Sequence, residues 1–367
     1  MLERMALLDR IENRNPRPTS TRWMDAARAL AIVAVVAIHN ISDTVETRFA
    51  EQGSAAWWLA VAIDSAARWA VPVFIMISGA LALDPARGVQ PREFLIKRFY
   101  RIGIPLIVWT GIYIWFRLYV LSGRENGWDP VVAVLRGAPF VQLYFLYVLA
   151  GLILLTPFMR LLPAFGSRRL QIGTATILIG IGVLDFLISF TVAVGEPNAA
   201  TRFVPMMGYY VLGWVLRDVI VSGRRLLLVW AGFLGSVALT ALWAGYGPGE
   251  TPWKAIFDYL SPSVVLMSVC AYLLLHAHLR RRLPFLEWLY PLSFGVFLLH
   301  SLLVFGLRRW IGVPDTWLSV LGHGVGLTLL YTVICALITW AAIRIPLLRG
   351  AFGQARPLQR RRMKEGI

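Results

Sequence analysis

The sequence predicts an all-α integral membrane protein with about ten transmembrane helices and both termini in the cytoplasm. Of the 367 residues, 58% are hydrophobic and only 15% are charged, whereas an average soluble domain has about 25% charged residues. A soluble core of this size could not bury so much apolar surface. Apolar segments of about 20 residues, the length that crosses a bilayer as a helix, recur along the chain. Basic residues cluster in alternate connections, which indicates the topology.

Ten segments are apolar and long enough to cross the membrane. They are predicted to be helices, because lipid offers the backbone no hydrogen bonds and the alternating pattern of a barrel is absent. The second and tenth are long enough to be tilted or kinked, and Pro72 marks the predicted kink in the second. The predicted spans are residues 24–42, 57–83, 102–121, 142–162, 170–192, 203–221, 225–246, 259–279, 285–307 and 316–343.

The connections are short, so the sequence predicts one transmembrane domain over residues 24–344. A cytoplasmic segment, residues 1–23, is expected to precede it, and a basic cytoplasmic tail, residues 345–367, to follow it. About 22 polar and charged residues come before the first apolar segment, which is unlike a cleaved signal peptide. The first span is therefore expected to be retained.

Basic residues indicate the orientation of the spans. With a cytoplasmic N-terminus, 26 of the 36 Lys and Arg residues fall on the cytoplasmic side, seven in outer loops and three within spans. This asymmetry is the usual one in membrane proteins, and it predicts an even number of spans. The net charge of +16 has the same origin, so no nucleic-acid partner is expected.

The first span carries an arginine and a histidine that lipid disfavours. Arg28 and His39 lie eleven residues apart in "WMDAARALAIVAVVAIHN". Eleven steps of 100° make about three full turns, so both project from one helix face, with His39 about 16 Å farther from the cytoplasm. A charge at the centre of a membrane helix costs about 2.5–3.5 kcal/mol on insertion scales and usually faces a cavity or a partner. The alternative is an interfacial histidine that is hydrogen-bonded to a neighbour.

Ionisable residues in the second and ninth spans are predicted to lie at a depth similar to that of His39. Asp64 and Arg68 are four residues apart in "DSAARWAVPVFIMISG", so they share a helix face and can pair. His300, in "LSFGVFLLHSLLV", lies about 15 residues into its span. A structural ion pair and a buried, hydrogen-bonded histidine remain the alternative explanations. Asp185 is expected to be buried within the fifth span.

A basic cluster comes just before the third span, in "FLIKRFYRIGIP". Lys97, Arg98 and Arg101 are predicted to form a compact cationic face at the cytoplasmic surface, which suits phosphate groups. The alternative is an anchor to lipid headgroups. No HExxH, paired CxxC or phosphate-cradling glycine loop is present, and the two cysteines lack metal or redox spacing. No metal is therefore expected.

Five stretches of the sequence occur in a characteristic order from the first span to the ninth. They are "WMDAARALAIVAVVAIH", "RWAVPVFIMISGALAL", "FLIKRFYRIGIPLIVW", "LYFLYVLAGLILLTP" and "LSFGVFLLH". Together they resemble the acyltransferase-3 family of polytopic membrane acyltransferases over essentially the whole chain. The sequence is similar to the compact, stand-alone branch that includes enterobacterial-common-antigen-type O-acetyltransferases. Tyr144 departs from the family pattern, in which a different aromatic residue, such as Trp, is expected at this position.

The resemblance implies transfer of an acyl group, expected to be acetyl, from cytoplasmic acyl-CoA to a hydroxyl of a glycan, glycolipid or similar acceptor. The protein would act as a multi-pass protein of the cell inner (plasma) membrane, with the bilayer, the donor and the acceptor as its partners. The positions that match the family's motifs are Arg28, His39, Arg68, Arg98 and Arg101. Of these, Arg28, Arg98 and Arg101, together with Lys97, are expected to bind the phosphates of the donor.

The expected chemistry assigns a role to each ionisable residue at the depth of His39. His39 removes the acceptor's hydroxyl proton, although an acyl-histidine intermediate is an open alternative. Arg68 stabilises the developing oxyanion or orients the acceptor. Asp64 holds Arg68, and His300 contacts His39 or the acceptor. A different class, a transporter or flippase, also fits ten spans with buried charges, but the sequence shows no inverted repeat.

Overall fold

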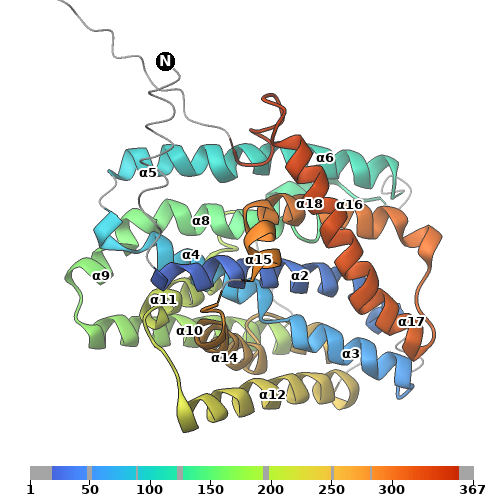
Figure 1. Cartoon of the computed structure of the whole chain (residues 1–367), viewed down its shortest axis with the longest axis horizontal. Coiled ribbons are helices and arrows are strands. Elements are labelled where there is room, and N and C mark those ends of the chain that lie inside the picture. The colour runs from blue at the N-terminus through green and yellow to red at the C-terminus, as the bar shows by residue number, and fades with distance from the viewer. Residues whose placement is uncertain are drawn as a thin grey trace, which may run out of the picture.

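The structure is a computed structural model that describes residues 19–47, 52–87, 90–121, 127–192, 198–248, 252–281 and 283–354. All regular secondary structure in these ranges is helical (Figure 1). The α-helices are α2 (Thr19–Thr47), α3 (Ala55–Ala67), α4 (Ala70–Ala82), α5 (Pro91–Arg98), α6 (Ile104–Tyr119), α7 (Pro130–Leu135), α8 (Tyr144–Met159), α9 (Leu161–Phe165), α10 (Arg168–Thr191), α11 (Met207–Leu216), α12 (Gly223–Tyr246), α13 (Pro252–Ile256), α14 (Pro262–His278), α15 (Pro284–Leu289), α16 (Ser293–Ile311), α17 (Trp317–Leu321) and α18 (Thr328–Ala342).

The predicted all-α membrane fold is confirmed. Within the described residues, eight helical stretches are long and apolar enough to cross a membrane. Two shorter apolar helices, Val204–Leu216 and Pro262–His278, stand where the sixth and eighth spans are predicted. The count of ten spans and the cytoplasmic position of both termini remain predictions, because most of the two basic terminal segments, residues 1–18 and 355–367, lies outside the described residues.

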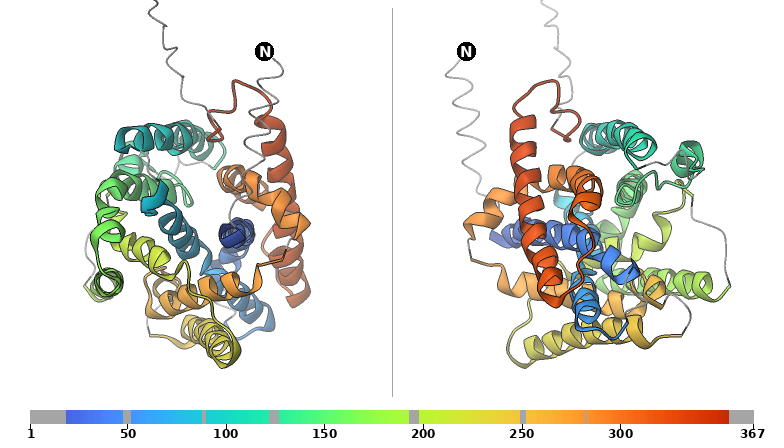
Figure 2. Two further views of the ribbon diagram at one scale, coloured as in Figure 1. Left: turned by 60° about the vertical axis from the view of Figure 1, so that its left-hand side comes forward. Right: turned by 90° about the vertical axis from the view of Figure 1, so that its right-hand side faces the viewer.

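Helix α2 forms the centre of the bundle. Helices α3, α4, α14, α15, α16 and α18 pack around it, as the two turned views make plain (Figure 2). Small and branched apolar side chains dominate its middle, and Ala27, Ile32 and Val36 are completely buried there. The polar residues within this middle part of α2, such as His39, are therefore surrounded by other helices of the protein.

Helices α10 and α12 lie at the periphery of the bundle (Figures 1 and 2). Their outward faces carry large exposed apolar side chains, among them Leu184 and Leu228. Such faces suit contact with lipid tails, as expected of a membrane protein. Asp185 is exposed on α10, so the prediction that it is buried is wrong. The apolar run around it did not reveal that none of the described helices packs on this face of α10.

The second span is interrupted between α3 and α4. The interruption lies at Arg68 and Trp69, one turn before Pro72. Proline has no N–H to donate to the carbonyl four residues earlier, which is that of Arg68, and its ring clashes with that carbonyl. The kink predicted at Pro72 therefore falls at Arg68, and it places this arginine at a helix end inside the protein.

The third and tenth spans each contain a π-helical turn. Phe99–Gly103 joins α5 to α6, and Gly322–Leu327 joins α17 to α18. Pro105 explains the first turn, because it cannot donate to the carbonyl of Arg101. The N–H of Ile104 instead donates to the carbonyl of Phe99, five residues before. Such turns shift the helix face by a fraction of a turn and often occur at functional sites.

Glycines allow α4 and α11 to pack backbone against backbone. A Cβ atom at Gly79 would overlap the backbone carbonyl of Tyr210, and one at Gly213 would overlap that of Met76. Small residues at such positions are the usual means by which membrane helices approach closely. Gly79, near the end of the second span, thus serves helix packing.

We expect Gly79→Ala to destabilise the protein by about 1–3 kcal/mol, because overpacking forces the backbones of α4 and α11 apart. Gly235→Ala in α12 is the matched control, since a Cβ there meets no atom within 4 Å. Thermal unfolding of the detergent-purified variants, followed by tryptophan fluorescence, measures the difference. Equal midpoints for the two variants would contradict this account of the packing.

Candidate active site

His39 and His300 lie side by side in the protein. His39 comes from α2 and His300 from α16, and their ring centroids are 5.2 Å apart with 32° between the ring planes. His300 is completely buried. Its Nδ1 lies 2.8 Å from the carbonyl oxygen of Phe297 and 3.1 Å from that of Val296. Since a carbonyl only accepts, Nδ1 carries the proton and Nε2 is left to accept a hydrogen bond from the Ser301 hydroxyl, at 3.2 Å.

The His39 ring differs from the His300 ring in its exposure and in its hydrogen bonds. His39 is partly exposed, and its ring makes no hydrogen bond with any described residue. Its backbone carbonyl accepts from Nη2 of Arg308 at 3.4 Å, which ties α2 to α16 at this level. An unengaged imidazole beside a buried one is a suitable proton acceptor, because its ring nitrogen is available to a ligand.

Asp64 and Arg68 form the ion pair that their spacing predicts. Their side chains approach to 2.5 Å, with Asp64 fully buried and the Arg68 side chain 12% exposed. The hydroxyl of Ser42, on α2, lies 3.4 Å from the Asp64 carboxylate. The Arg68 guanidinium also lies over the Phe257 ring, 4.3 Å from its centroid. The arginine is thus held between the Asp64 carboxylate and the Phe257 ring.

Two tyrosines that sequence reasoning did not single out as a pair complete this cluster. The rings of Tyr144 and Tyr259 stack with centroids 6.5 Å apart and planes 20° apart. Both lie within electrostatic range of Arg68, and Arg68 lies within that of His39. Tyr259 lies at the start of the eighth predicted span, where an aromatic residue is ordinary in a membrane helix. No sequence pattern separates it from the other tyrosines.

A second group of polar residues surrounds the N-terminal end of α2. The Arg28 side chain hydrogen-bonds to Tyr290 and lies within electrostatic range of Arg101. A cavity of about 250 Å³ opens beside Tyr290. Arg22, Arg280 and Arg281 line it, together with Asp25 and Glu287. The sequence identified these three arginines only as markers of topology, whereas the fold gathers them around one cavity.

The arginines of the predicted cationic face have different neighbours in the structure. Arg101 lies near Arg28, whereas Arg98 lies over the Phe94 ring, 5.2 Å from its centroid. The Arg160 guanidinium also lies over this ring, 4.5 Å from its centroid. The π-helical turn begins directly after Arg98 and contains Arg101, so the angle between the two side chains differs from that in a regular helix.

Lys97 faces a different environment from the two arginines. It is 56% exposed and pairs with Glu93 at 2.5 Å on the outer side of α5. The part of the chain that the structure describes contains no group of three or more His, Cys, Asp or Glu side chains that could hold a metal ion. The candidate site therefore consists of hydrogen-bonding and ionisable side chains at two depths along α2.

Comparison with protein families assigns the chain to one family. A family model described as "Acyltransferase domain" matches residues 21–343, which is nearly the whole chain. The chain belongs to the acyltransferase-3 family, and the predicted resemblance is confirmed. It is a polytopic membrane acyltransferase by family and by fold. No curated protein and no solved structure shows significant similarity to the chain.

The Asp64–Arg68 pair yields a test of stability. Asp64→Ala leaves Arg68 uncompensated in the interior, and we expect a loss of about 3–5 kcal/mol of unfolding free energy. The double variant Asp64→Leu/Arg68→Met removes both charges and should regain most of that loss. Thermal unfolding in detergent compares the three proteins. A double variant no more stable than Asp64→Ala would show that the charges are not coupled.

Proposed function

We propose that the protein transfers an acyl group, acetyl, from cytoplasmic acyl-CoA to a hydroxyl of a glycan, glycolipid or similar acceptor at the outer face of the inner membrane. One observation carries the proposal: a single helix, α2, presents Arg28 among arginines near one end and His39 beside a second histidine farther along. Eleven residues separate them, which corresponds to about 16 Å along the helix. The arrangement suits a long donor bound at one side and used nearer the other.

The arginine-rich end supports donor binding. Acyl-CoA carries several phosphate charges, and arginine binds phosphates through charge-assisted, often bidentate hydrogen bonds. Arg28 and Arg101 lie within electrostatic range of each other, which favours an anion near both. The neighbouring cavity, lined by Arg22, Arg280 and Arg281, has room for part of the nucleotide. The thin, largely uncharged pantetheine arm would then run along α2 toward His39.

The histidine end supports acyl transfer. A ring nitrogen of His39 takes the proton of the acceptor hydroxyl while the hydroxyl oxygen attacks the thioester carbonyl carbon. The tetrahedral intermediate carries its charge on the former carbonyl oxygen, which the Arg68 guanidinium stabilises. Collapse breaks the carbon–sulfur bond, and the imidazolium returns the proton to the leaving thiolate. His300, with its tautomer set by backbone carbonyls, positions His39 through the ring contact.

Family membership and the side-chain arrangement favour an enzyme over a transporter or flippase. The two classes differ in one cheap measurement, the consumption of labelled acetyl-CoA by membranes that contain the protein. Comparison of surface glycans and lipids from cells with and without the gene, by mass spectrometry, identifies the acceptor through a lost acetyl increment. No acetyl-CoA consumption together with unchanged glycans and lipids would refute the proposed function.

We expect His39→Ala to abolish acetyl transfer, with at least a thousandfold loss of rate, while the protein still inserts in the membrane. The matched control is His278→Ala, because His278 accepts a hydrogen bond from Trp230 at the bundle's edge and lies away from the pair. Membranes adjusted to equal protein content are assayed with radiolabelled acetyl-CoA. Retained transfer in His39→Ala would exclude this residue as the base.

We expect Arg28→Gln and Arg101→Gln each to raise the KM for acetyl-CoA by about tenfold or more, because each removes a charge-assisted contact worth about 1.5–3 kcal/mol. Arg225→Gln serves as the control, since Arg225 is exposed at the start of the peripheral helix α12. Initial rates at varied acetyl-CoA concentration give KM and kcat separately. Unchanged KM values in both variants would place the donor elsewhere.

A further inference from the structure

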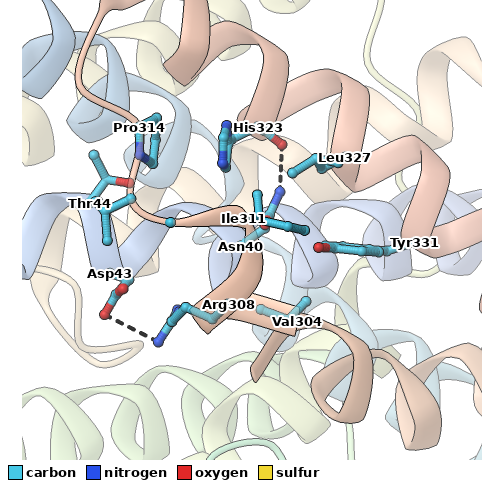
Figure 3. A pocket seen from close by; sticks show the side chains of 12 residues that line it. Asn40, Asp43, Thr44, Val304, Arg308, Ile311, Pro314, His323, Leu327 and Tyr331 are labelled. Carbon is cyan, nitrogen blue, oxygen red and sulfur yellow. Dashed lines mark hydrogen bonds and ion pairs between the residues drawn. The ribbon is translucent and has the colours of Figure 1, made fainter. Parts of the chain in front are cut away.

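A small polar pocket lies at the C-terminal end of α2, beyond His39 (Figure 3). Asp43 follows His39 by four residues, so it lies on the same helix face about 6 Å farther along. The pocket has a volume of about 20 Å³, which is room for about one water molecule or one hydroxyl group. The polar side chains that line it are Asn40, Asp43, Thr44, Arg308, His323 and Tyr331.

The frame of the pocket is fixed by hydrogen bonds. Arg308 pairs with Asp43 at 3.1 Å and also donates to the backbone carbonyl of His39. Asn40 donates through Nδ2 to the backbone carbonyl of His323 at 2.5 Å. Figure 3 shows the Asp43–Arg308 and Asn40–His323 contacts as dashed lines. Arg308 therefore links the pocket to the part of α2 that carries His39.

Two polar atoms of the pocket are buried without a hydrogen-bond partner among the described residues: Nε2 of His323 and Oγ1 of Thr44. The Nδ1 of His323 lies 2.8 Å from the carbonyl of Ser319 and must donate to it. Its Nε2 is therefore an acceptor without a donor. Buried polar groups in proteins are nearly always hydrogen-bonded, so two such atoms in one pocket point to a ligand.

Thr44 differs from several other helical threonines of this protein, and Thr110 is the other one whose buried hydroxyl has no partner among the described residues. Thr47, Thr156 and Thr332 each donate to the carbonyl four residues before, at 2.7–2.8 Å. Thr44 is 1% exposed, yet its hydroxyl makes no such bond. Its hydroxyl proton is therefore available to a group in the pocket. Together, Thr44 offers a donor and His323 an acceptor, which is the complement of one hydroxyl group.

We propose that this pocket binds a second hydroxyl of the acceptor, next to the hydroxyl that His39 deprotonates. The acceptor is then a polyhydroxylated molecule, a glycan, rather than an alcohol with a single hydroxyl. The bound hydroxyl donates to Nε2 of His323 and accepts from Oγ1 of Thr44. The pocket is too small for a sugar ring, so only a hydroxyl or hydroxymethyl group enters it. The inference rests on the proposed acyl transfer and adds the class of acceptor.

Two variants remove the groups that would bind the second hydroxyl while they preserve the shape of the pocket. Thr44→Val replaces the hydroxyl with a methyl group. His323→Asn keeps a donor for the Ser319 carbonyl and deletes Nε2. The matched control is Thr47→Val, because Thr47 is exposed and lies one turn beyond the pocket. Each protein is expressed in cells that lack the native gene, and acetyl esters on surface glycans and lipids are quantified over time by mass spectrometry.

We expect Thr44→Val and His323→Asn to lower the initial rate of glycan acetylation at least tenfold, and Thr47→Val to leave it unchanged. Calorimetric binding of acetyl-CoA to the detergent-purified proteins should stay within twofold of wild type, and thermal midpoints should stay close. Wild-type transfer rates in both pocket variants would overturn the inference. So would an equal loss of donor binding or stability, which indicates a structural water in the pocket.

The outcome for the wild-type protein separates this inference from the proposed function. If wild-type protein neither binds acetyl-CoA nor acetylates any surface molecule, acyl transfer from acetyl-CoA itself is refuted, and the pocket inference falls with it. If it acetylates a lipid that carries a single hydroxyl, acyl transfer stands and the polyhydroxylated acceptor is refuted. If it acetylates a glycan position with a neighbouring free hydroxyl, and the pocket variants fail, both stand.

Discussion

The absence of hydrogen-bonding partners in lipid is the constraint on which the arrangement of this protein depends. An ionisable side chain within a membrane helix must find its partners in the protein, and these partners bring particular helices together. Asp64 and Arg68 show the effect most directly, since the pair is buried and also contacts Ser42 of α2. Arg308 does the same at the end of α2, where it joins Asp43 to the carbonyl of His39. These contacts hold α2, α3 and α16 in one register around the two histidines.

Helix α2, at the centre of the bundle, connects two separate cavities of the protein. Arg22, at its first turn, lines the basic cavity, and Asp43, near its last turn, lines the small polar pocket. The 21 residues between them span about 30 Å along a helix, which is close to the thickness of a bilayer core. One continuous helix thus connects an arginine-rich end with a hydroxyl-sized pocket, and His39 lies between them. A donor with a long arm and an acceptor on the other side of the membrane can meet at such a helix.

Local sequence rules predicted several parts of this site and failed at others for identifiable reasons. The pairing of Asp64 with Arg68 follows from a four-residue spacing, which is a local property of any helix. The different neighbours of Arg98 and Arg101 do not follow from such a spacing, because Pro105 introduces a π-helical turn that begins after Arg98 and contains Arg101. Pro72 has a comparable effect and breaks the helix one turn earlier, at Arg68. Both prolines are visible in the sequence. Whether the helix breaks or forms a wider turn at a proline depends on the side chains that pack beside it.

The sequence by itself determined the helical membrane class, the family and the facing of Arg28 and His39, because composition, order of motifs and helical period are properties of the chain alone. Only the tertiary structure decided that His300 lies 5.2 Å from His39. It alone decided that Tyr259 joins Arg68, and that Thr44 and His323 share a pocket. These residues are up to 279 positions apart (Thr44 to His323), and no local period relates them. Their meeting depends on how helices of similar apolar character pack against one another, which is set by the fit of side chains across many contacts.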